Sequence, residues 1–356
     1  MPRNALCIKT LTVYGGKAIA AVSKLGIFDK DLKVQRNNLH VYVPIARNPT
    51  PAESEKIRNE IPSFEVSSRL FQERRKHPKT FIEILMDKMP PHVSACLPRS
   101  IDFVGDIAII EIPPELENYK WEIGKAVMQV HKNVRTVLAK AGAVKGTYRL
   151  REFEVIAGEN KTETVHKEHG CKYHVDLSCA YFSPRLSYEH KRVASSVKEN
   201  ETVLDMFAGV GPFSILIAKT LGKVKVYALD VNPSAVALLE RNVKVNRVEG
   251  KVHPVLGDAK QIVKQKLQGA ADRVIMNLPE KALMFVDAAC EALKPEGGII
   301  HLYSFVKGLD DLKETESRIA EEVEKYGRRF GRILFSRLVR ETAPYTWQAV
   351  LDAEVF

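Results

Sequence analysis

The sequence predicts an α/β protein in which a parallel sheet, ending in an antiparallel hairpin, follows two small α+β units. From about residue 171 apolar strands alternate strictly with helices, a pattern typical of a parallel sheet buried on both faces. The chain has 356 residues, which is too many for one typical core. The segment 48–51, Asn-Pro-Thr-Pro, indicates a linker. We therefore expect domains at residues 1–68, 69–170 and 171–356.

Composition and charge indicate a globular protein with a polyanionic partner. Hydrophobic residues make up 45% and charged residues 28% of the chain, which is ordinary for a soluble protein. The net charge of +10 favours a partner such as nucleic acid, although a basic protein without one would look the same. The sequence has no apolar run of transmembrane length, no signal peptide and no Cys-x-x-Cys pair among its five cysteines. We therefore expect a cytoplasmic protein with neither a membrane segment nor a disulfide framework.

The first unit is expected to contain a small sheet and two helices. Its elements are the strand Ala5–Thr10, the helix Gly16–Leu25, and the strands Leu32–Gln35 and Leu39–Ile45, which form a hairpin. A second helix begins after Thr50, because Thr50 can cap it, Pro51 suits its first position and Glu53 completes a capping box.

The second unit is expected to mix two helices with five strands. The helices are Phe81–Met89 and Lys120–His131, and the strands are Ile101–Phe103, Ile107–Ile112, Thr136–Ala139, Tyr148–Ile156 and Glu163–His166. The turn at 158–160, Gly-Glu-Asn, predicts that the last two strands form a hairpin.

The third unit is expected to contain five parallel strands and a terminal hairpin. The parallel strands are Thr202–Phe207, Lys225–Leu229, Val252–Val255, Arg273–Met276 and Gly298–Tyr303. The helices between and after them include Ser234–Val245, Ala282–Leu293 and Asp310–Tyr326. The two strands of the terminal hairpin are Arg332–Glu341 and Trp347–Phe356. Such a terminal hairpin is unusual for a nicotinamide-binding domain and usual at the end of a methyltransferase sheet.

A glycine loop at 204–213, Leu-Asp-Met-Phe-Ala-Gly-Val-Gly-Pro-Phe, lies between the first strand and the next helix. Gly209 and Gly211 let the backbone turn tightly and approach a ligand closely. Asp205 ends the strand, and Asp230, nineteen residues after Gly211, ends the next one, where an acid can accept hydrogen bonds from ribose hydroxyls. The loop therefore predicts a nucleoside-like cofactor, unless it is an ordinary tight turn beside two acids.

The third and fourth strand ends narrow the choice of cofactor. Asp258 follows the third strand and can accept from an adenine amino group, and Asn277-Leu278-Pro279 follows the fourth. Asn/Asp-x-Pro at this place is a hallmark of enzymes that methylate nitrogen in a planar system, because its amide oxygen and rigid backbone can hold a base edge, although Asn and Pro are also common turn residues. We therefore expect S-adenosylmethionine as cofactor. The predicted cofactor contacts are Asp205, Phe207, Ala208, Gly209, Gly211, Asp230, Val231, Asp258, Ala259 and Asn277.

The segment 181–189 predicts a helix start in front of the sheet. Ser183 can cap this helix and Pro184 suits its first position. Arg185 and Glu189 then lie one turn apart, where the plainest interpretation is a surface ion pair. Arg149 lies on an expected strand, where it could be solvated.

Two further groups of residues are open to interpretation. His166, His169, Cys171 and His174 are spaced like metal ligands, but no second cysteine pair completes a zinc motif, so we expect no bound metal. Basic stretches lie at 69–79 and 328–340. Each suits either phosphate contact or a solvated face, and we expect RNA contact for at least one of them.

Four motifs together carry a family resemblance: Tyr-Phe-Ser-Pro-Arg-Leu at 181–186, Asp-Met-Phe-Ala-Gly-Val-Gly-Pro-Phe at 205–213, Asn-Leu-Pro at 277–279 and Ala-Pro-Tyr at 343–345. The chain resembles the archaeal and eukaryotic tRNA (guanine-37, N1)-methyltransferases over essentially its whole length, most strongly from Arg149 onward. The resemblance implies a class I, Rossmann-like methyltransferase domain that uses S-adenosylmethionine. It also implies a monomer that binds tRNA at the elbow, through the first unit, and at the anticodon stem-loop.

The resemblance also implies roles for residues of the target pocket. Glu189 is the general base and Arg149 stabilises O6 of guanine. Asn277 holds the base edge with Pro279 beside it, and Tyr181 and Arg185 shape the pocket. These roles suit the chemistry, because guanine N1 must lose its proton to a base and the charge then moves toward O6. The target base must also leave its stack, and no metal is needed.

Three alternatives remain open at the level of sequence. Glu280 follows the Asn-Leu-Pro motif where subfamilies differ, so carbon methylation of 4-demethylwyosine at position 37 is an alternative or additional activity. A nucleotide-dependent oxidoreductase is disfavoured by the Asn-Leu-Pro motif and the terminal hairpin. A non-catalytic RNA-binding protein would have no need of Glu189, Asn277 or the glycine loop.

Overall fold

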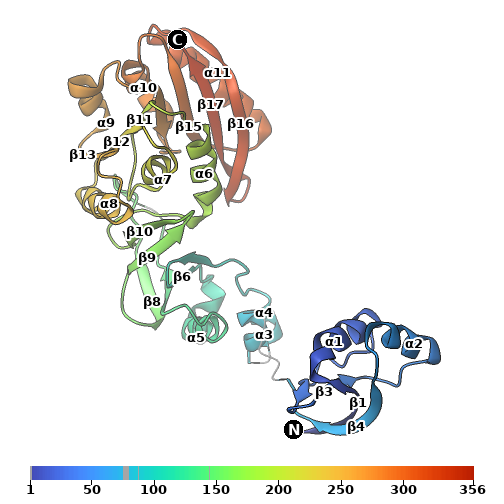
Figure 1. The fold of residues 1–356 in the computed structure, drawn as a ribbon. Helices are drawn as coiled ribbons and strands as arrows, with labels where there is room; N and C mark the ends of the chain where they lie inside the picture. The colour runs from blue at the N-terminus through green and yellow to red at the C-terminus, as the bar shows by residue number, and fades with distance from the viewer. Residues whose placement is uncertain (1, 75–79, 87, 144) are drawn as a thin grey trace. The chain divides into compact units, whose positions relative to one another are not determined.

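The computed structural model describes residues 2–74, 80–86, 88–143 and 145–356 (Figure 1). The chain forms two compact units, 1–79 and 80–356. Strand β4, Glu65–Phe71, runs across the boundary expected at residue 68. The second unit contains both the middle and the C-terminal regions expected from the sequence, and their separation into two domains stays a prediction. Within the described ranges, no helix is both long and apolar enough to cross a membrane.

The first unit is a four-stranded antiparallel sheet in the order β2-β3-β1-β4. Its other strands are β1 (Arg3–Leu11), β2 (Gln35–Arg36) and β3 (His40–Ile45). The hairpin expected from Leu32 is confirmed only at its inner end, because β2 has two residues. Strand β4 was not predicted, because most of its residues are exposed at the sheet edge and show no apolar alternation.

Helices α1 (Gly15–Lys24) and α2 (Pro51–Glu60) belong to this unit, with a short 3₁₀ turn η1 (Thr12–Tyr14). The predicted capping box is confirmed, since Glu53 N donates to Thr50 Oγ1 and Thr50 N donates to Glu53 Oε2. In the first basic stretch, the Arg69 guanidinium lies 4.1 Å from the centre of the Tyr42 ring. Arg75, Lys76 and Lys79 of that stretch lie outside the described residues.

The second unit begins with a sheet in the order β5-β6-β7-β8, followed by a separate hairpin of β9 and β10. The strands are β5 (Asp102–Val104), β6 (Ile107–Ile110), β7 (Thr136–Lys140), β8 (Phe153–Gly158), β9 (Glu163–Glu168) and β10 (Cys171–Asp176). The helices are α3 (Phe81–Met86), α4 (Pro91–Ser94), η2 (Pro114–Tyr119) and α5 (Lys120–Val130).

The predicted hairpin between β8 and β9 is wrong. Strand β8 pairs with β7, and β9 pairs with β10. The turn after Gly158 is tied to the start of β7, because Glu159 N donates to the carbonyl of Arg135 and Thr136 Oγ1 donates to the carbonyl of Glu159. The chain therefore leaves this sheet after the turn instead of folding back on β8.

The remaining strands form one sheet in the order β13-β12-β11-β14-β15-β17-β16. They are β11 (Thr202–Asp205), β12 (Lys225–Asp230), β13 (Val252–Leu256), β14 (Arg273–Met276), β15 (Gly298–Val306), β16 (Phe330–Ala343) and β17 (Thr346–Val355). Strands β11 to β15 are parallel, and β17 inserts antiparallel between β15 and β16. The predicted parallel sheet with a terminal antiparallel hairpin is confirmed.

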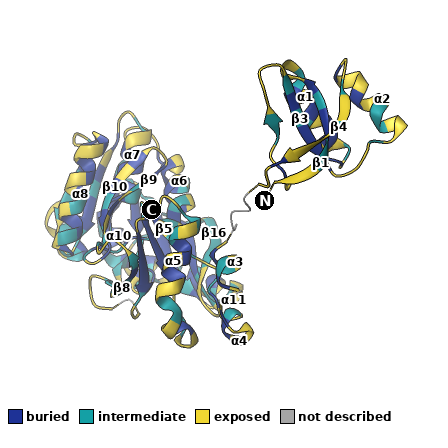
Figure 2. Cartoon of the chain, turned by 90° about the horizontal axis from the view of Figure 1, so that it is seen from below, coloured by how far each residue is buried: buried dark blue, intermediate teal, exposed yellow. Residues whose placement is uncertain are grey.

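Helices cover both faces of this sheet. They are η3 (Pro184–Leu186), α6 (Ser187–Ser196), α7 (Pro212–Thr220), α8 (Pro233–Asn246), α9 (Ala259–Ile262), the π-helical turn η4 (Val263–Leu267), η5 (Ala282–Phe285), α10 (Val286–Ala292) and α11 (Leu309–Lys325). Val203 and Ile275 face one core, with α6 to α8, while their neighbours Leu204 and Met276 face the other, with α10 and α11. Figure 2 shows both buried and exposed stretches along α8, as expected for a covering helix.

Helix α8 also satisfies the backbone of β10. Asn246 accepts from Lys172 N and donates to the carbonyl of Lys172, at 2.9 and 2.6 Å. One turn earlier, Asn242 makes the same pair of bonds with His174. The second amide hydrogen of Asn242 reaches the carbonyl of Val210 in the glycine loop, at 3.1 Å. Two buried asparagines therefore tie an otherwise unpaired strand edge and the loop to one helix.

Candidate active site

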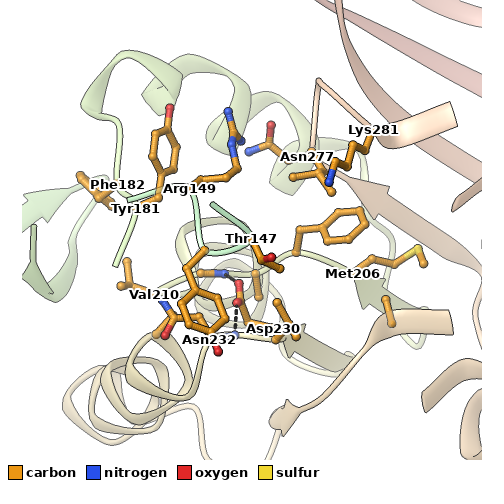
Figure 3. A pocket seen from close by; sticks show the side chains of 18 of the residues that line it. Thr147, Arg149, Tyr181, Phe182, Met206, Val210, Asp230, Asn232, Asn277 and Lys281 are labelled. Atoms are coloured by element: carbon orange, nitrogen blue, oxygen red, sulfur yellow. Dashed lines mark hydrogen bonds between the residues drawn. The ribbon is translucent and has the colours of Figure 1, made fainter. Parts of the chain in front are cut away.

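A cavity of about 240 Å³ opens at the carboxyl ends of β11 to β14 (Figure 3). Its walls come from the chain after each strand, namely residues 206–210, 230–232, 257–259 and 277–278. Residues 146–149 and 181–183 close it from the other side. The position is the one where open α/β sheets bind ligands, because the strand ends leave a crevice between diverging loops.

The glycine loop forms the floor of this cavity. Gly209 and Gly211 have φ values of 54° and 89°, which favour glycine. Gly209 lines the cavity and its N–H donates to Asp230 Oδ2 at 2.7 Å. Gly211 does not line the cavity. A Cβ atom there would lie 2.4 Å from Leu239 Cδ1, so this glycine allows the loop to pack on α8, and its contact with the cofactor stays a prediction.

The two predicted strand-end acids lie in different places. Asp230 lines the cavity, and its carboxylate also accepts from Asn232 N at 2.8 Å. Burial raises its pKa against the effect of these backbone donors. Asp205 does not line the cavity, because its side chain turns under the loop and accepts from Ser214 Oγ at 2.7 Å. Its burial is complete and raises its pKa to about 7, so Asp205 supports the loop through Ser214, and its contact with the cofactor stays a prediction.

The other predicted cofactor contacts line the cavity: Phe207, Ala208, Val231, Asp258, Ala259 and Asn277. Phe207 meets Phe285, which sequence reasoning missed, edge to face at 5.0 Å between ring centres. Asp258 also caps helix α9 through the N–H of Gln261. The cavity therefore combines an apolar aromatic wall with carboxylates at two strand ends.

Arg149 lies at the opposite end of the cavity, in a tight turn rather than on the predicted strand. Lys145 and Leu150 bridge across this turn, and Arg149 has a φ of 55°, a strained conformation for a residue with a side chain. Its guanidinium lies 4.8 Å from the centre of the Tyr181 ring, and Nη2 donates to Glu280 Oε1 at 3.3 Å. Its buried Nε has no hydrogen-bond partner among the described residues. Figure 3 shows Arg149, Tyr181 and Asn277 around this end of the cavity.

A second cavity of about 230 Å³ adjoins the first, and five residues line both: Arg149, Tyr181, Phe182, Ser183 and Glu280. Its remaining wall is rich in charge and includes Asp102, Lys140, Arg151, Arg185, Arg340 and Glu341. Arg185 bonds to Asp102 and not to Glu189, which excludes the alternative interpretation of Arg185 and Glu189 as a surface ion pair. The predicted cap by Ser183 is also wrong, because its hydroxyl accepts from Arg340 instead.

Glu189 lines neither cavity and is fully buried. Its Oε2 accepts from Arg192 Nε at 2.8 Å and from the Tyr303 hydroxyl at 3.0 Å. Its Oε1 forms an ion pair with Arg337 Nη2 at 2.9 Å, although without hydrogen-bond geometry. In this structure the predicted base is thus held inside a cluster of charges behind the cavity wall.

That cluster continues across the sheet from Arg192 to Asp352, which also accepts from His301 Nδ1 at 2.6 Å. Burial disfavours ionisation of Asp352, but His301 and Arg192 outweigh it and lower its pKa to about 2. Pro279 is buried outside both cavities, where its carbonyl accepts from Phe305 N.

His166, one of the residues spaced like metal ligands, lies beside the buried Glu168. Glu168 contacts His190 Nδ1 at 2.7 Å and His166 Nε2 at 3.7 Å. Burial opposes ionisation of Glu168, but the two histidines prevail and bring its pKa to about 2. Across the described ranges, no three His, Cys, Asp or Glu side chains are grouped to hold a metal ion.

Sequence reasoning missed several cavity residues, among them Thr147, Phe182, Asn232, Lys281 and Phe285. Asn232 had a signal, because Asn-Pro two residues after a strand-end acid is typical of a helix cap. The others had none, because their segments reach the cavity through tertiary packing.

Comparison with known proteins identifies related families for most of the chain. A family model described as the TRM5/TYW2 methyltransferase domain matches residues 164–330, and one described as the TYW2 N-terminal domain matches residues 81–162. A protein named tRNA (guanine(37)-N(1))-methyltransferase Trm5b from Pyrococcus abyssi is 39% identical over 93% of this chain and 93% of its own length. A protein of the same name from Methanocaldococcus jannaschii is 34% identical over 98% of each.

Further relatives match either a shorter part of the chain or nearly all of it. The protein named tRNA 4-demethylwyosine(37)-methyltransferase Taw21 from Saccharolobus solfataricus is 39% identical, over 77% of this chain and 98% of its own length. Among solved structures, the complex of aTrm5 with tRNALeu has a TM-score of 0.78 at 34% identity and covers 98% of this chain and 99% of that one. TYW2 from M. jannaschii in complex with AdoMet has a TM-score of 0.56 at 30% identity, over 72% of this chain and 99% of that one.

Proposed function

The chain belongs to the TRM5/TYW2 methyltransferase family, and we propose that it methylates N1 of the guanine at position 37 of tRNA, with S-adenosylmethionine as methyl donor. The observation that carries this proposal is the length of the match to the two Trm5b proteins, over 93% and 98% of the chain. A match of 98% includes the first unit, residues 1–79. The proposed activity is therefore inferred from relatives that match nearly the whole chain, and not from relatives that share only the catalytic fold.

The cavity residues fit the cofactor. Asp230 and Asp258 offer carboxylate oxygens at neighbouring strand ends, and Phe207 and Phe285 offer an apolar wall for a flat ring. Gly209 leaves the backbone open at the floor, because among the described residues other than its chain neighbours only the carbonyl oxygen of Tyr181 lies within 4 Å of the position that a Cβ would take. These residues would hold S-adenosylmethionine, whose sulfonium supplies an already activated methyl group.

The end of the cavity at Arg149 suits the target base. Guanine N1 carries a proton at neutral pH, and its removal moves negative charge toward O6. Arg149 is preorganised by its turn and by the Tyr181 ring, and its unpartnered Nε leaves it able to donate to such a charge. Asn277 lies at the same end, on the carboxyl end of β14. Tyr181 separates this end from the second cavity and lines both.

We keep Glu189 as the proposed acceptor of the N1 proton, on the role that the family resemblance gives it. Its neighbours Leu186 and His190 line the cavity, so the carboxylate is close behind the wall. Before Glu189 can accept the proton, its ion pair with Arg337 must break. The Arg337 side chain is 35% exposed, which is more than any other partner of Glu189 named above. An RNA phosphate that attracts Arg337 would favour this release. Glu280 is the competing candidate, because it lines both cavities and already contacts Arg149.

The tRNA itself is the proposed macromolecular partner. The net charge of +10 suits a phosphate backbone, and Lys140, Arg151, Arg185 and Arg340 line the second cavity beside the target end. The first unit is proposed to contact the tRNA elbow, and the remainder to contact the anticodon stem-loop. A cytoplasmic location and a monomeric state complete the proposal.

One observation favours a second activity, the methylation of 4-demethylwyosine at the same position. The Taw21 relative is as similar in sequence, at 39% identity, as the first Trm5b relative. Its match leaves about a quarter of this chain uncovered, since it spans 77%. Full-length similarity therefore favours N1 methylation as the main activity.

The proposal is tested by product analysis. The full-length protein is incubated with S-adenosylmethionine and unmodified tRNA transcripts carrying G37 or A37, and the nucleosides are identified by mass spectrometry. We expect 1-methylguanosine from the G37 transcript and no product from the A37 transcript. Methylation of both transcripts, or of the G37 transcript at another nucleotide, would refute the target. A parallel reaction on tRNA that carries 4-demethylwyosine tests the second activity.

A further inference from the structure

We propose that Gln348 is a positioning residue that holds the Asn277 amide with its NH₂ group toward the target base. The inference rests on the proposed methylation. A series of hydrogen bonds runs from β16 to the cavity. Arg340 Nη1 donates to Ser183 Oγ at 3.2 Å, and Arg340 Nε donates to Gln348 Oε1 at 3.0 Å. Gln348 Nε2 then donates to Asn277 Oδ1 at 3.3 Å.

The donor and acceptor of each of these hydrogen bonds follow from the chemistry of the three side chains, Arg340, Gln348 and Asn277. The oxygen and nitrogen of an amide are nearly the same size, so their assignment depends on their partners. Arginine can only donate, and the Gln348 atom that faces Arg340 must therefore be its oxygen. The Gln348 nitrogen therefore faces Asn277. Because this nitrogen donates the hydrogen bond, the Asn277 atom that accepts it must be the amide oxygen. The strand register holds the first link in place, because Arg340 lies directly opposite Gln348 in the β16–β17 pair.

Burial prevents an easy reversal of this arrangement. Gln348 is only 2% exposed, so water cannot replace either of its partners without cost. Asn277, by contrast, lines the cavity. Its Nδ2 has no hydrogen-bond acceptor within the described part of the chain, and Figure 3 shows this nitrogen on the side of Arg149. The sequence had suggested that the amide oxygen of Asn277 would hold the base edge, and the hydrogen-bond chain reverses that assignment.

The consequence for the reaction is electrostatic. Arg149 and the Asn277 amide both present N–H donors at one end of the cavity. Donors suit the guanine edge once N1 has lost its proton, because negative charge has then spread to O6. An amide oxygen in the same place would repel that charge. Gln348 touches neither substrate nor cofactor in this account, and acts only through Asn277.

The substitution Gln348→Glu tests the orientation. A carboxylate at this position can only accept, so the Asn277 amide must turn its nitrogen to the new carboxylate and its oxygen to the base. We expect kcat on the G37 transcript to fall by about tenfold or more, with KM for tRNA and Kd for S-adenosylmethionine within about twofold. Gln265→Glu, which adds the same charge at an exposed position of η4, should leave all three unchanged.

A double-mutant cycle separates orientation from charge or folding. In an Asn277→Ala background, Gln348→Glu should cause no further loss of kcat, because no amide remains to be turned. An equal loss in both backgrounds, or an unchanged kcat in the single variant, would overturn the inference. If Gln348→Glu does not fold, the similarly sized Gln348→Met takes its place, because it removes the donor that holds the Asn277 oxygen; the expected loss of kcat is about threefold and also vanishes without Asn277. Failure of the wild-type protein to methylate G37 would instead sink the proposed function.

Discussion

The two ends of the active-site cavity are built in different ways. The proposed cofactor end consists of loops that directly follow β11, β12 and β13, and hydrogen bonds between backbone groups, such as Ala208 N to the carbonyl of Leu229 and Gly257 N to the carbonyl of Asp230, hold them together. The proposed base end consists of Arg149, Tyr181 and Asn277, which come from three distant segments. Side chains hold these together, including the Glu280 contact of Arg149 and the Gln348 contact of Asn277.

This difference indicates which part of the site tolerates amino-acid substitutions. Backbone bonds between neighbouring strand ends do not depend on side-chain identity, so many sequences can build a cofactor site of this kind. The base end depends on individual side chains and their partners. We therefore expect substitutions at the base end to change the rate and those at the cofactor end to change stability and cofactor affinity.

The largest expected effect is at the proposed base. Glu189→Gln should lower the single-turnover rate of methyl transfer by about 100-fold or more, because the amide cannot take the N1 proton. The affinity for S-adenosylmethionine, measured by calorimetry, should stay within about twofold, since Glu189 does not line the cofactor cavity.

Glu280→Gln is the matched control for this substitution. It removes the contact with Arg149 at the cavity wall and should lower the rate by only about tenfold or less. The reverse order, with a near-normal rate in Glu189→Gln and a collapse in Glu280→Gln, would transfer the base role to Glu280.

Gly211→Ala should damage the cofactor end through packing. The new Cβ would lie 2.4 Å from Leu239 Cδ1, at a φ of 89° that disfavours alanine. We expect a loss of about 3 kcal/mol in the free energy of unfolding, measured with urea. Gly209→Ala should cost only about 1–2 kcal/mol, because its Cβ would meet a single atom at 3.6 Å. Equal losses would show that backbone strain, and not packing, governs the loop.

The raised pKa of Asp205 leads us to expect that the stability of the folded protein depends on pH. Its pKa in the folded protein is raised by burial from the ordinary 3.8 to about 7. Between these values only the unfolded chain releases the proton, so this contribution to stability is complete below about pH 4 and is lost as the pH rises to about 7.

Asp205→Asn removes that titration and can still accept from Ser214. Relative to wild type, its free energy of unfolding should rise by about 4 kcal/mol between pH 4 and pH 8. Thermal unfolding at the two pH values measures the change. The same difference from wild type at both values would show that Asp205 ionises normally in the folded protein.

A smaller effect is expected where α8 supports the loop. Asn242→Ala leaves the backbone groups of His174 and the carbonyl of Val210 without a partner, and should cost about 2 kcal/mol of unfolding free energy. Glu240→Ala, at an exposed position of the same helix, should change it by less than about 0.5 kcal/mol. Urea titrations of both variants test the contrast, and an equally mild Asn242→Ala would mean that water satisfies the strand edge.

Local pattern was enough to predict most of the fold. Strand β14 was expected at its observed bounds, Arg273–Met276, because a short apolar run beside a turn has few alternatives. Strand β4 was missed because it is mostly exposed. The partner of β9 was assigned wrongly, because the turn after Gly158 is visible in the sequence while the bonds that tie it to Arg135 are not.

The candidate site divides in the same way. Asp230, Asp258 and Asn277 could be placed in one crevice from the order of strands alone. The burial of Glu189 could not, because its partners Arg337 and Tyr303 lie more than 100 residues away in the chain. The turn that carries Arg149 was also missed. Arg149 has a left-handed backbone conformation, which a sequence pattern predicts mainly where a glycine occupies the position.

The most direct test of the division between the two ends is Arg149→Met. This change removes the guanidinium from the base end and keeps an unbranched apolar side chain against Tyr181. We expect the single-turnover rate on a G37 transcript at saturating S-adenosylmethionine to fall by about 100-fold, with the Kd for S-adenosylmethionine within about threefold of wild type. An unchanged rate together with a greatly weakened Kd would show that Arg149 serves the cofactor, and would contradict the account.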